Sequence, residues 1–168
     1  VPTNGCPGPI EIPLSRDLVV IAYDSEYWLF PHQKNTPNVD CECTSKADFL
    51  QQLDQLLYDN RDKTIILASH HPMRTYGTHG GYYSIKQHIF PLTEKWKNLY
   101  LPLPFVGSLY PILRSTVLQT PEDKPHPLYT DLVDEVTALF KSFPNIIYVA
   151  GHDHGLQLIQ DQDITQVV

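Results

Sequence analysis

The chain has 168 residues, of which 42% are hydrophobic, and a net charge of −7 at pH 7. One domain is the default for this length, and the hydrophobic content suffices for a core, but no apolar run approaches the ~20 residues of a membrane span. The excess of carboxylates argues against nucleic-acid binding, which requires basic patches. An anionic substrate stays open, because bound metal ions can reverse the local sign of the charge.

The first part of the chain predicts two strands and one helix. Residues 1–16 are rich in Pro and Gly and predict a loop with a short edge strand at Ile10–Ile12. Residues 18–23 (LVVIAY) predict a buried strand, and residues 31–44 predict a polar loop. A helix is expected to begin after Ser45, because an acidic residue follows three positions later as in a capping box. Its apolar positions form one stripe at helical spacing: Phe49, Leu50, Leu53, Leu56 and Leu57.

A long aromatic and Pro-rich segment follows the next predicted strand, residues 64–68 (TIILA). We interpret residues 73–127 as an insertion into a single partial domain that covers residues 1–168. A structureless loop of this length is improbable in a compact domain, so short helices are expected at residues 84–90 and 108–116. We expect the insertion to lie over a site, as a lid or a substrate wall.

The last part of the chain predicts a helix from about Thr130 to Ser142, a buried strand at residues 146–150, and a hairpin at residues 156–159 and 165–168. Strands and helices therefore alternate along most of the chain. This order predicts an α/β (α+β) domain with a mixed sheet.

Histidines follow two of the predicted buried strands. Residues 69–72 (SHHP) contain His70 and His71, and residues 151–155 (GHDHG) contain His152 and His154. The simplest alternative is a set of solvated histidines in turns. However, open α/β sheets place ligands outside the carboxyl ends of their strands, and imidazole is the commonest metal-ligating side chain. Two such sets favour a metal site at that edge of the sheet.

These motifs resemble the calcineurin-like metallophosphoesterase superfamily, in which Gly-His-x-His follows one strand and His-x-Pro follows another. Residues 151–157 (GHDHGLQ) are especially similar to the purple acid phosphatase branch. Residues 4–9 (NGCPGP), Tyr27-Trp28 and residues 79–81 (HGG) resemble a bacterial subgroup in which some phosphoesterase domains precede an outer-membrane surface-antigen barrel. The resemblance implies the C-terminal half of a metallophosphoesterase β-sandwich flanked by helices.

The resemblance also implies a ligand set and an activity. His70 and His152 would bind one metal ion and His154 a second, in a dinuclear site for divalent or trivalent ions such as Zn, Fe or Mn. The His-x-Pro pattern selects His70 over its neighbour His71, which would support a ligand or face the substrate. His79 would touch a substrate phosphate. The expected activity is the hydrolysis of phosphoric esters, because two metal ions activate water and clamp the attacking and leaving oxygens.

The family pattern is incomplete in this chain. Its first half supplies Asp-x-His, Gly-Asp and Gly-Asn-His, and none of the three occurs here. We therefore expect the remainder of a longer parent chain to supply Asp, His and Asn ligands, and we expect little activity from this piece alone. Contact with a membrane is expected only through a barrel domain outside this segment.

The three cysteines, Cys6, Cys41 and Cys43, lack the spacing of a zinc knuckle. They are either buried or free thiols, or Cys6 forms a disulfide with Cys41 or Cys43. A disulfide would fit an oxidising compartment, so an extracytoplasmic location, periplasmic or cell-surface, is expected.

Several other polar residues have two interpretations. Asp24 follows a predicted strand and either faces the site or orients a loop, and we favour the loop. Arg74 and Arg114 are either phosphate partners or exposed cations. His88 and His126 are interpreted as surface histidines.

Two other functions compete with the hydrolase. A lone structural or adventitious Zn site needs only three histidines. Alternatively, the domain is an inactive phosphoesterase fold that binds a partner through its aromatic insertion. The sequence leaves the substrate open among protein phosphate, nucleotide, phospholipid head group and small-molecule ester.

Overall fold

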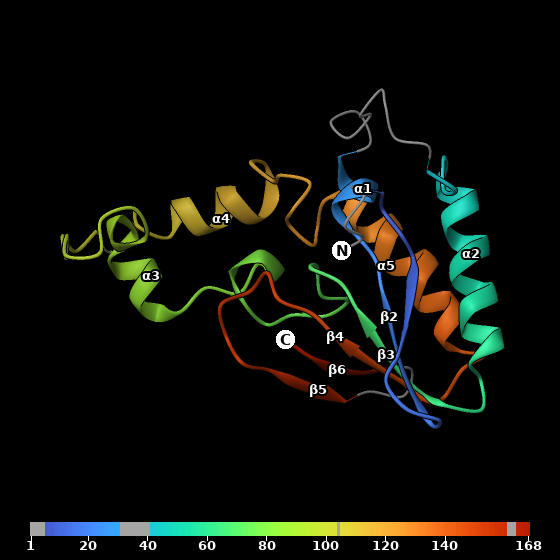
Figure 1. The fold of residues 1–168 in the computed structure, drawn as a ribbon. Helices are drawn as coiled ribbons and strands as arrows, with labels where there is room; N and C mark the ends of the chain where they lie inside the picture. The colour runs from blue at the N-terminus through green and yellow to red at the C-terminus, as the bar shows by residue number, and fades with distance from the viewer. Residues whose placement is uncertain (1–5, 31–40, 104, 161–163) are drawn as a thin grey trace.

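The structure is a computed structural model that describes residues 6–30, 41–103, 105–160 and 164–168 (Figure 1). Within these residues six strands form one sheet in the order β1-β2-β3-β4-β6-β5. Strands β2, β3, β4 and β6 are parallel, whereas β1 and β5 pair antiparallel at the two edges. The strand bounds are Ile10–Pro13 (β1), Leu18–Ala22 (β2), Thr64–Ala68 (β3), Ile146–Val149 (β4), Leu158–Gln160 (β5) and Thr165–Val167 (β6). The predicted mixed sheet, with its edge strand and hairpin, is confirmed.

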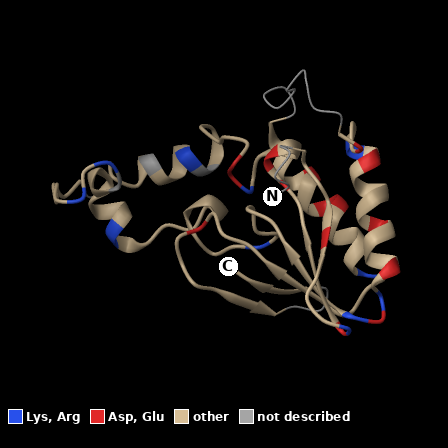
Figure 2. Cartoon of the chain, viewed as in Figure 1, with Lys and Arg blue, Asp and Glu red and all other residues tan. Residues whose placement is uncertain are grey.

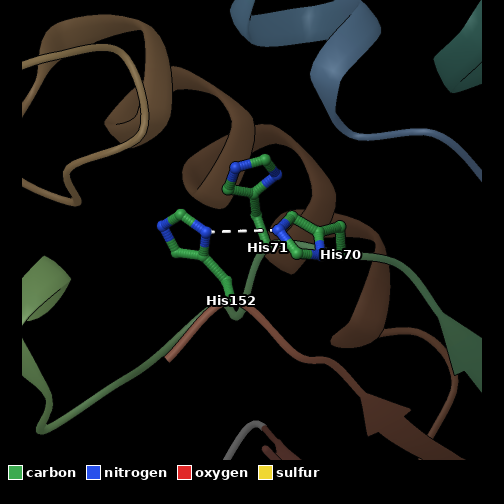
Figure 3. A group of neighbouring side chains, drawn as sticks. All are labelled: His70, His71 and His152. Atoms are coloured by element: carbon green, nitrogen blue, oxygen red, sulfur yellow. Dashed lines mark hydrogen bonds between the residues drawn. The ribbon is translucent and has the colours of Figure 1, made fainter. Parts of the chain in front are cut away.

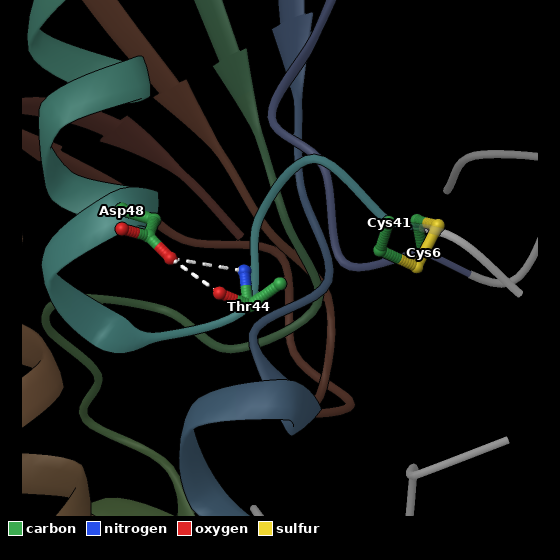
Figure 4. Close-up of a disulfide and its surroundings, with 4 residues drawn as sticks. All are labelled: Cys6, Cys41, Thr44 and Asp48. Atoms are coloured by element: carbon green, nitrogen blue, oxygen red, sulfur yellow. Dashed lines mark hydrogen bonds between the residues drawn. A yellow bond between two sulfur atoms is a disulfide. The ribbon is translucent and has the colours of Figure 1, made fainter. Parts of the chain in front are cut away.

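Capping interactions and proline set the first residues of the two long helices. Ser45 Oγ accepts a hydrogen bond from the Asp48 backbone N–H, as predicted, and the Asp48 carboxylate accepts from the Thr44 N–H and hydroxyl (Figure 4). The last long helix was predicted to begin near Thr130 and begins instead at Pro127, because proline needs no N–H in the first turn. The helix bounds are Glu26–Leu29 (α1), Lys46–Asp59 (α2), Ile85–Ile89 (α3), Leu109–Thr116 (α4) and Pro127–Phe140 (α5), with 3-10 turns at Thr78–Gly80 (η1) and Pro91–Glu94 (η2).

Both long helices cover the same face of the sheet. β2, β3 and β4 are neighbours in chain order, and right-handed crossovers in one direction place their helices on one face. Figure 1 shows α2 and α5 next to each other against the sheet. Their apolar stripes and the facing strand residues form the core, which includes Val19, Ile21, Phe49, Leu53, Leu57, Ile65, Leu67, Leu132, Val136, Phe140 and Tyr148.

The opposite face of the sheet is also apolar. Val20, Ile66 and Ile147 lie side by side on it in the strand register, and all three are only partly buried. On the same face, near the β5 edge of the sheet, the side chain of Leu158 is 74% exposed. The core cluster of the described residues includes none of these side chains. The family resemblance predicts a β-sandwich, whose second sheet would pack on this partly buried face. That second sheet stays a prediction.

The insertion contains the two short helices that the sequence predicts. α3 and α4 correspond to the helices expected at residues 84–90 and 108–116. In Figure 1 they extend away from the sheet, on the side opposite to α2. Near the two ends of the insertion, His79 of η1 and the backbone carbonyl of Glu122 contact the strand-end residue His152. These contacts are consistent with the prediction that the insertion forms a wall of the site. That the insertion acts as a lid stays a prediction.

A disulfide ties the N-terminal segment to the loop before α2. Cys6 pairs with Cys41 (Figure 4), and Cys43 is a buried thiol. The structure thus decides between the two pairings that the sequence left open. Among the described helices, none has both the length and the apolarity that crossing a membrane requires.

Candidate metal centre

Three neighbouring parallel strands deliver side chains to one edge of the sheet. Ser25 follows β2, His70 and His71 follow β3, and His152 follows β4. Because these strands are parallel, their carboxyl ends meet at the same edge. The strand-end histidines therefore converge, as the sequence predicts for His70 and His152.

The imidazoles of His70, His71 and His152 form one cluster (Figure 3). One ligand nitrogen from each residue lies within 4.8 Å of the others, and His152 Nδ1 is 3.3 Å from His70 Nε2. The ring centroids of His71 and His152 are 4.5 Å apart. Three imidazoles at these separations can bind one metal ion.

The His152 ring is held in a defined tautomer. Its Nε2 lies 2.8 Å from the carbonyl oxygen of Glu122, which only accepts hydrogen bonds, so Nε2 carries the proton. Nδ1 then presents its lone pair toward His70. Burial lowers the pKa of His152 below its usual value of 6.5, which keeps the ring neutral at pH 7. Its backbone has φ of 69°, an unfavourable region that often marks a functional turn.

His71 is fully buried and fixed on two sides. Ser25 Oγ lies 2.7 Å from His71 Nδ1 and accepts a hydrogen bond from the His71 backbone N–H. The Tyr148 hydroxyl donates to the His71 carbonyl and lies 3.0 Å from the Tyr23 hydroxyl. Burial raises the pKa of Tyr23 to about 12, so this phenol stays neutral. Any metal bond from His71 would be made by Nε2.

His79 lies beside the cluster and is paired with a carboxylate. Its ring centroid is 4.0 Å from that of His152, and its Nδ1 is 3.3 Å from Asp123 Oδ1. Asp123 also accepts hydrogen bonds from Arg114 and from the backbone and hydroxyl of Thr120. Burial alone would raise the pKa of Asp123, but these hydrogen bonds outweigh it and hold the pKa below its usual value. Asp123 is therefore an anion that orients His79.

Asp153 stabilises the turn that carries His79. It is buried and accepts hydrogen bonds from the Thr75 hydroxyl and the His79 backbone N–H. A side chain at Gly77 would collide with this carboxylate, so glycine is required there. Asp153 thus supports the turn beside the cluster.

Replacing Asp123 with Asn should lower the free energy of unfolding by about 1–3 kcal/mol at pH 7, because Arg114 loses its charged partner. A carboxyl whose pKa is lowered on folding stabilises the fold above its unfolded pKa of about 4, and this contribution is lost as the pH falls through the folded value. The difference from wild type should therefore shrink below about pH 4 in urea titrations. Asp54→Asn, on the exposed side of α2, is the matched control. If Asp123→Asn and Asp54→Asn lowered the free energy of unfolding by the same amount, the stabilising role assigned to the Asp123 carboxylate would be wrong.

The structure brings some predicted site residues together and separates others. His70, His71, His79 and His152 lie in or beside the cluster, whereas His154 is exposed and is not a member of it. Arg114 pairs with Asp123. Asp24 orients its loop, as favoured, by accepting from the Glu26 N–H.

Two residues of the centre escaped sequence analysis. Ser25 has no motif around it, and its position just beyond a buried strand is the one signal that could have indicated it. Asp123 lies in a turn-rich segment without any motif, and only its contacts with His79 and Arg114 reveal it. Comparison of the chain with protein-family models, with curated proteins and with solved structures found no match.

Proposed function

We propose that this chain is part of a metal-dependent phosphoric ester hydrolase of the calcineurin-like type, and that it contributes the histidine-rich half of the metal site. The observation that carries the proposal is the His70, His71 and His152 cluster at the carboxyl edge of the sheet. The motifs that resemble the superfamily contain all three residues. The substrate class is a phosphoric ester.

The cluster fits a metal ion of the Zn, Fe or Mn type. In tetrahedral coordination with metal–nitrogen bonds of about 2.0–2.1 Å, two ligand nitrogens lie roughly 3.3–3.4 Å apart. The His152 Nδ1 to His70 Nε2 distance of 3.3 Å matches this edge. A ligand nitrogen of His71 lies within 4.8 Å of those of His70 and His152, which supports His71 as the third member of the group. Neutral imidazoles suit these metals, and the lowered pKa of His152 maintains that state.

The chain's own residues have separate roles around the ions. When bound, the metal ions would supply an activated water and stabilise charge on the phosphoryl group. His70 and His152 would hold one of the ions, with the Glu122 carbonyl fixing the tautomer of His152. His79, oriented by Asp123, would exchange a proton with the phosphate or with the leaving group. Ser25 positions His71. His154 stays a proposed ligand of the second ion.

The remainder of a parent chain is proposed to complete this half-site. Supporting this, the face of the sheet around Val20, Ile66 and Ile147 is apolar and only partly buried, as expected for a surface that packs on another sheet. The sequence lacks the Asp-x-His, Gly-Asp and Gly-Asn-His motifs that carry most oxygen ligands in this superfamily. An extracytoplasmic location is also proposed, and the Cys6–Cys41 disulfide supports it.

A second candidate function is a single structural Zn site. It is favoured by the exclusion of His154 from the cluster, which leaves three imidazoles for one ion among the described residues. In this case the domain would bind one metal ion per chain and would hydrolyse no ester.

The test uses a version of the protein extended at its N-terminus into the parent sequence. It should contain about two metal ions and hydrolyse a generic aryl phosphate, and His152→Ala should lower turnover by about 100-fold or more. His88→Ala is the control, because His88 contacts Ser108 within the insertion, away from the cluster. Full activity in His152→Ala would refute the metal assignment. One metal ion without any esterase activity would favour the structural Zn site.

A further inference from the structure

Residues 82–118, as far as the structure describes them, form a projecting apolar arm. Twelve of the nineteen exposed large hydrophobic side chains among the described residues lie on the arm. They include Trp96, which is 51% exposed, and Phe105, which is 94% exposed. The core cluster contains no residue from the arm. Because a soluble domain rarely leaves such a concentration of apolar surface unused, the arm is a candidate binding surface.

The arm differs in charge from the rest of the molecule. It contains four Lys and Arg residues and a single carboxylate, whereas the whole chain carries a net charge of −7. Figure 2 shows Lys and Arg along the arm, and Asp and Glu gathered on α1, α2 and α5. Arg114 is paired with Asp123, so the remaining positive charge of the arm comes from Lys86, Lys95 and Lys97, and the acidic helices lie away from it.

The lysines of the arm lie against its aromatic rings. Lys95 Nζ is 4.9 Å from the ring centroid of Trp96, and Lys86 Nζ is 5.0 Å from that of Tyr100. Trp and Tyr favour the boundary between lipid head groups and acyl chains, where the ring is buried and its polar atom stays in water. Lysine extends its ammonium from the same depth toward lipid phosphates. This pairing matches the chemistry of a bilayer surface.

We propose that the arm binds the surface of an anionic phospholipid bilayer, with the side chains around Trp96, Tyr100, Phe105 and Val106 entering the head-group region. A protein partner would be a poorer match, because lysine is depleted at protein–protein interfaces, whereas basic residues beside apolar rings are typical of peripheral membrane binding. The groove of about 690 Å³ between η2 and α4, lined by Leu92, Trp96 and Leu109 among others, adds concave apolar surface. The sequence had predicted membrane contact only through a barrel outside this segment.

This proposal does not depend on the metal site. The arm begins just after η1, which carries His79, and it ends shortly before Asp123. Only the base of the arm therefore adjoins the histidine cluster, and the rest extends away from the sheet (Figure 1).

Tryptophan fluorescence gives a direct measurement on the 168-residue chain. Trp28 is 3% exposed and lies in the core, so a change on binding reports Trp96. Vesicles of phosphatidylcholine with about 30% phosphatidylserine should shift the emission to the blue, and pure phosphatidylcholine should bind about tenfold more weakly or worse. Raising NaCl from about 50 to about 500 mM should weaken binding, because it screens the lysines.

Paired variants separate charge from apolar insertion. Lys95→Glu with Lys97→Glu should weaken vesicle binding by about tenfold or more, whereas Lys141→Glu, an exposed lysine next to α5, should change it less than about twofold. Phe105→Ser should also weaken binding, and Leu156→Ser, which alters a similarly exposed side chain outside the arm, should not. Circular dichroism should show that all variants fold.

Three outcomes would overturn the proposal. The first is the absence of a Trp96 shift with anionic vesicles at low salt. The second is equal binding by the Lys95→Glu, Lys97→Glu variant and by wild type. The third is self-association of the chain through the arm, detected as a dimer by light scattering. If this dimer does not bind vesicles, the arm is a protein interface instead.

Discussion

Zn²⁺ titrated into this chain should bind at one site, and His152→Ala should lower the affinity by about 100-fold or more. The variant removes the imidazole whose Nδ1 lies 3.3 Å from His70 Nε2, so His71 and His70 alone remain. Calorimetry on the 168-residue chain measures the affinity. Binding should weaken as the pH falls through the pKa of His152, which burial lowers below its usual value, because a protonated imidazole cannot ligate a metal.

Two further variants sharpen this test. His88→Ala removes an imidazole that contacts Ser108 within the insertion and should leave the Zn²⁺ affinity unchanged. Ser25→Ala removes the hydroxyl that fixes the His71 ring and should weaken binding by about 10-fold, as expected for a group that only orients a ligand. If His152→Ala and His88→Ala bind Zn²⁺ as tightly as wild type, the cluster is not the site.

Removing the Cys6–Cys41 disulfide should lower the free energy of unfolding by about 3–4 kcal/mol. The two cysteines are 35 residues apart, and the loop that they close contains β1, β2 and α1. The disulfide limits the freedom of this loop in the unfolded chain, so its loss should favour unfolding. The double variant Cys6→Ser, Cys41→Ser should show the effect in urea denaturation and a melting temperature lower by roughly 10 °C.

A reductant provides the internal control for this prediction. Dithiothreitol should lower the urea midpoint of the wild-type protein to that of the double variant, and it should leave the double variant unchanged. Cys43→Ser alters the buried thiol outside the disulfide, so dithiothreitol should still lower the midpoint of that variant. A double variant as stable as the oxidised wild type would show that the disulfide contributes little.

Most secondary structure was predictable because its signals are local. The apolar run of β3 and the apolar stripe of α2 depend on residues a few positions apart, and both elements lie where the sequence predicts. α5 begins three residues before the periodic apolar pattern predicts, because Pro127 is itself a strong N-terminal signal. The position of histidines after two strands likewise follows from local sequence.

The contacts that make up the centre could not be predicted in this way. Ser25 meets His71 across 46 residues, and His79 meets Asp123 across 44 residues. Such pairs depend on which strands are neighbours and on how the insertion returns to the sheet. The selection of Cys41 over Cys43 as the partner of Cys6 has the same origin, because two cysteines in one loop differ only in where their side chains point.

By itself, the sequence determined the strands, the two long helices, the two short helices of the insertion and the placing of imidazoles beyond two strands, because alternation, periodicity and capping act over a few residues. Only the tertiary structure decided that His71 joins His70 and His152 while His154 stays exposed, that Asp123 orients His79, and that, among the described residues, one face of the sheet is only partly covered. These features result from the strand order and from two crossovers on the same face, and both are properties of the whole chain.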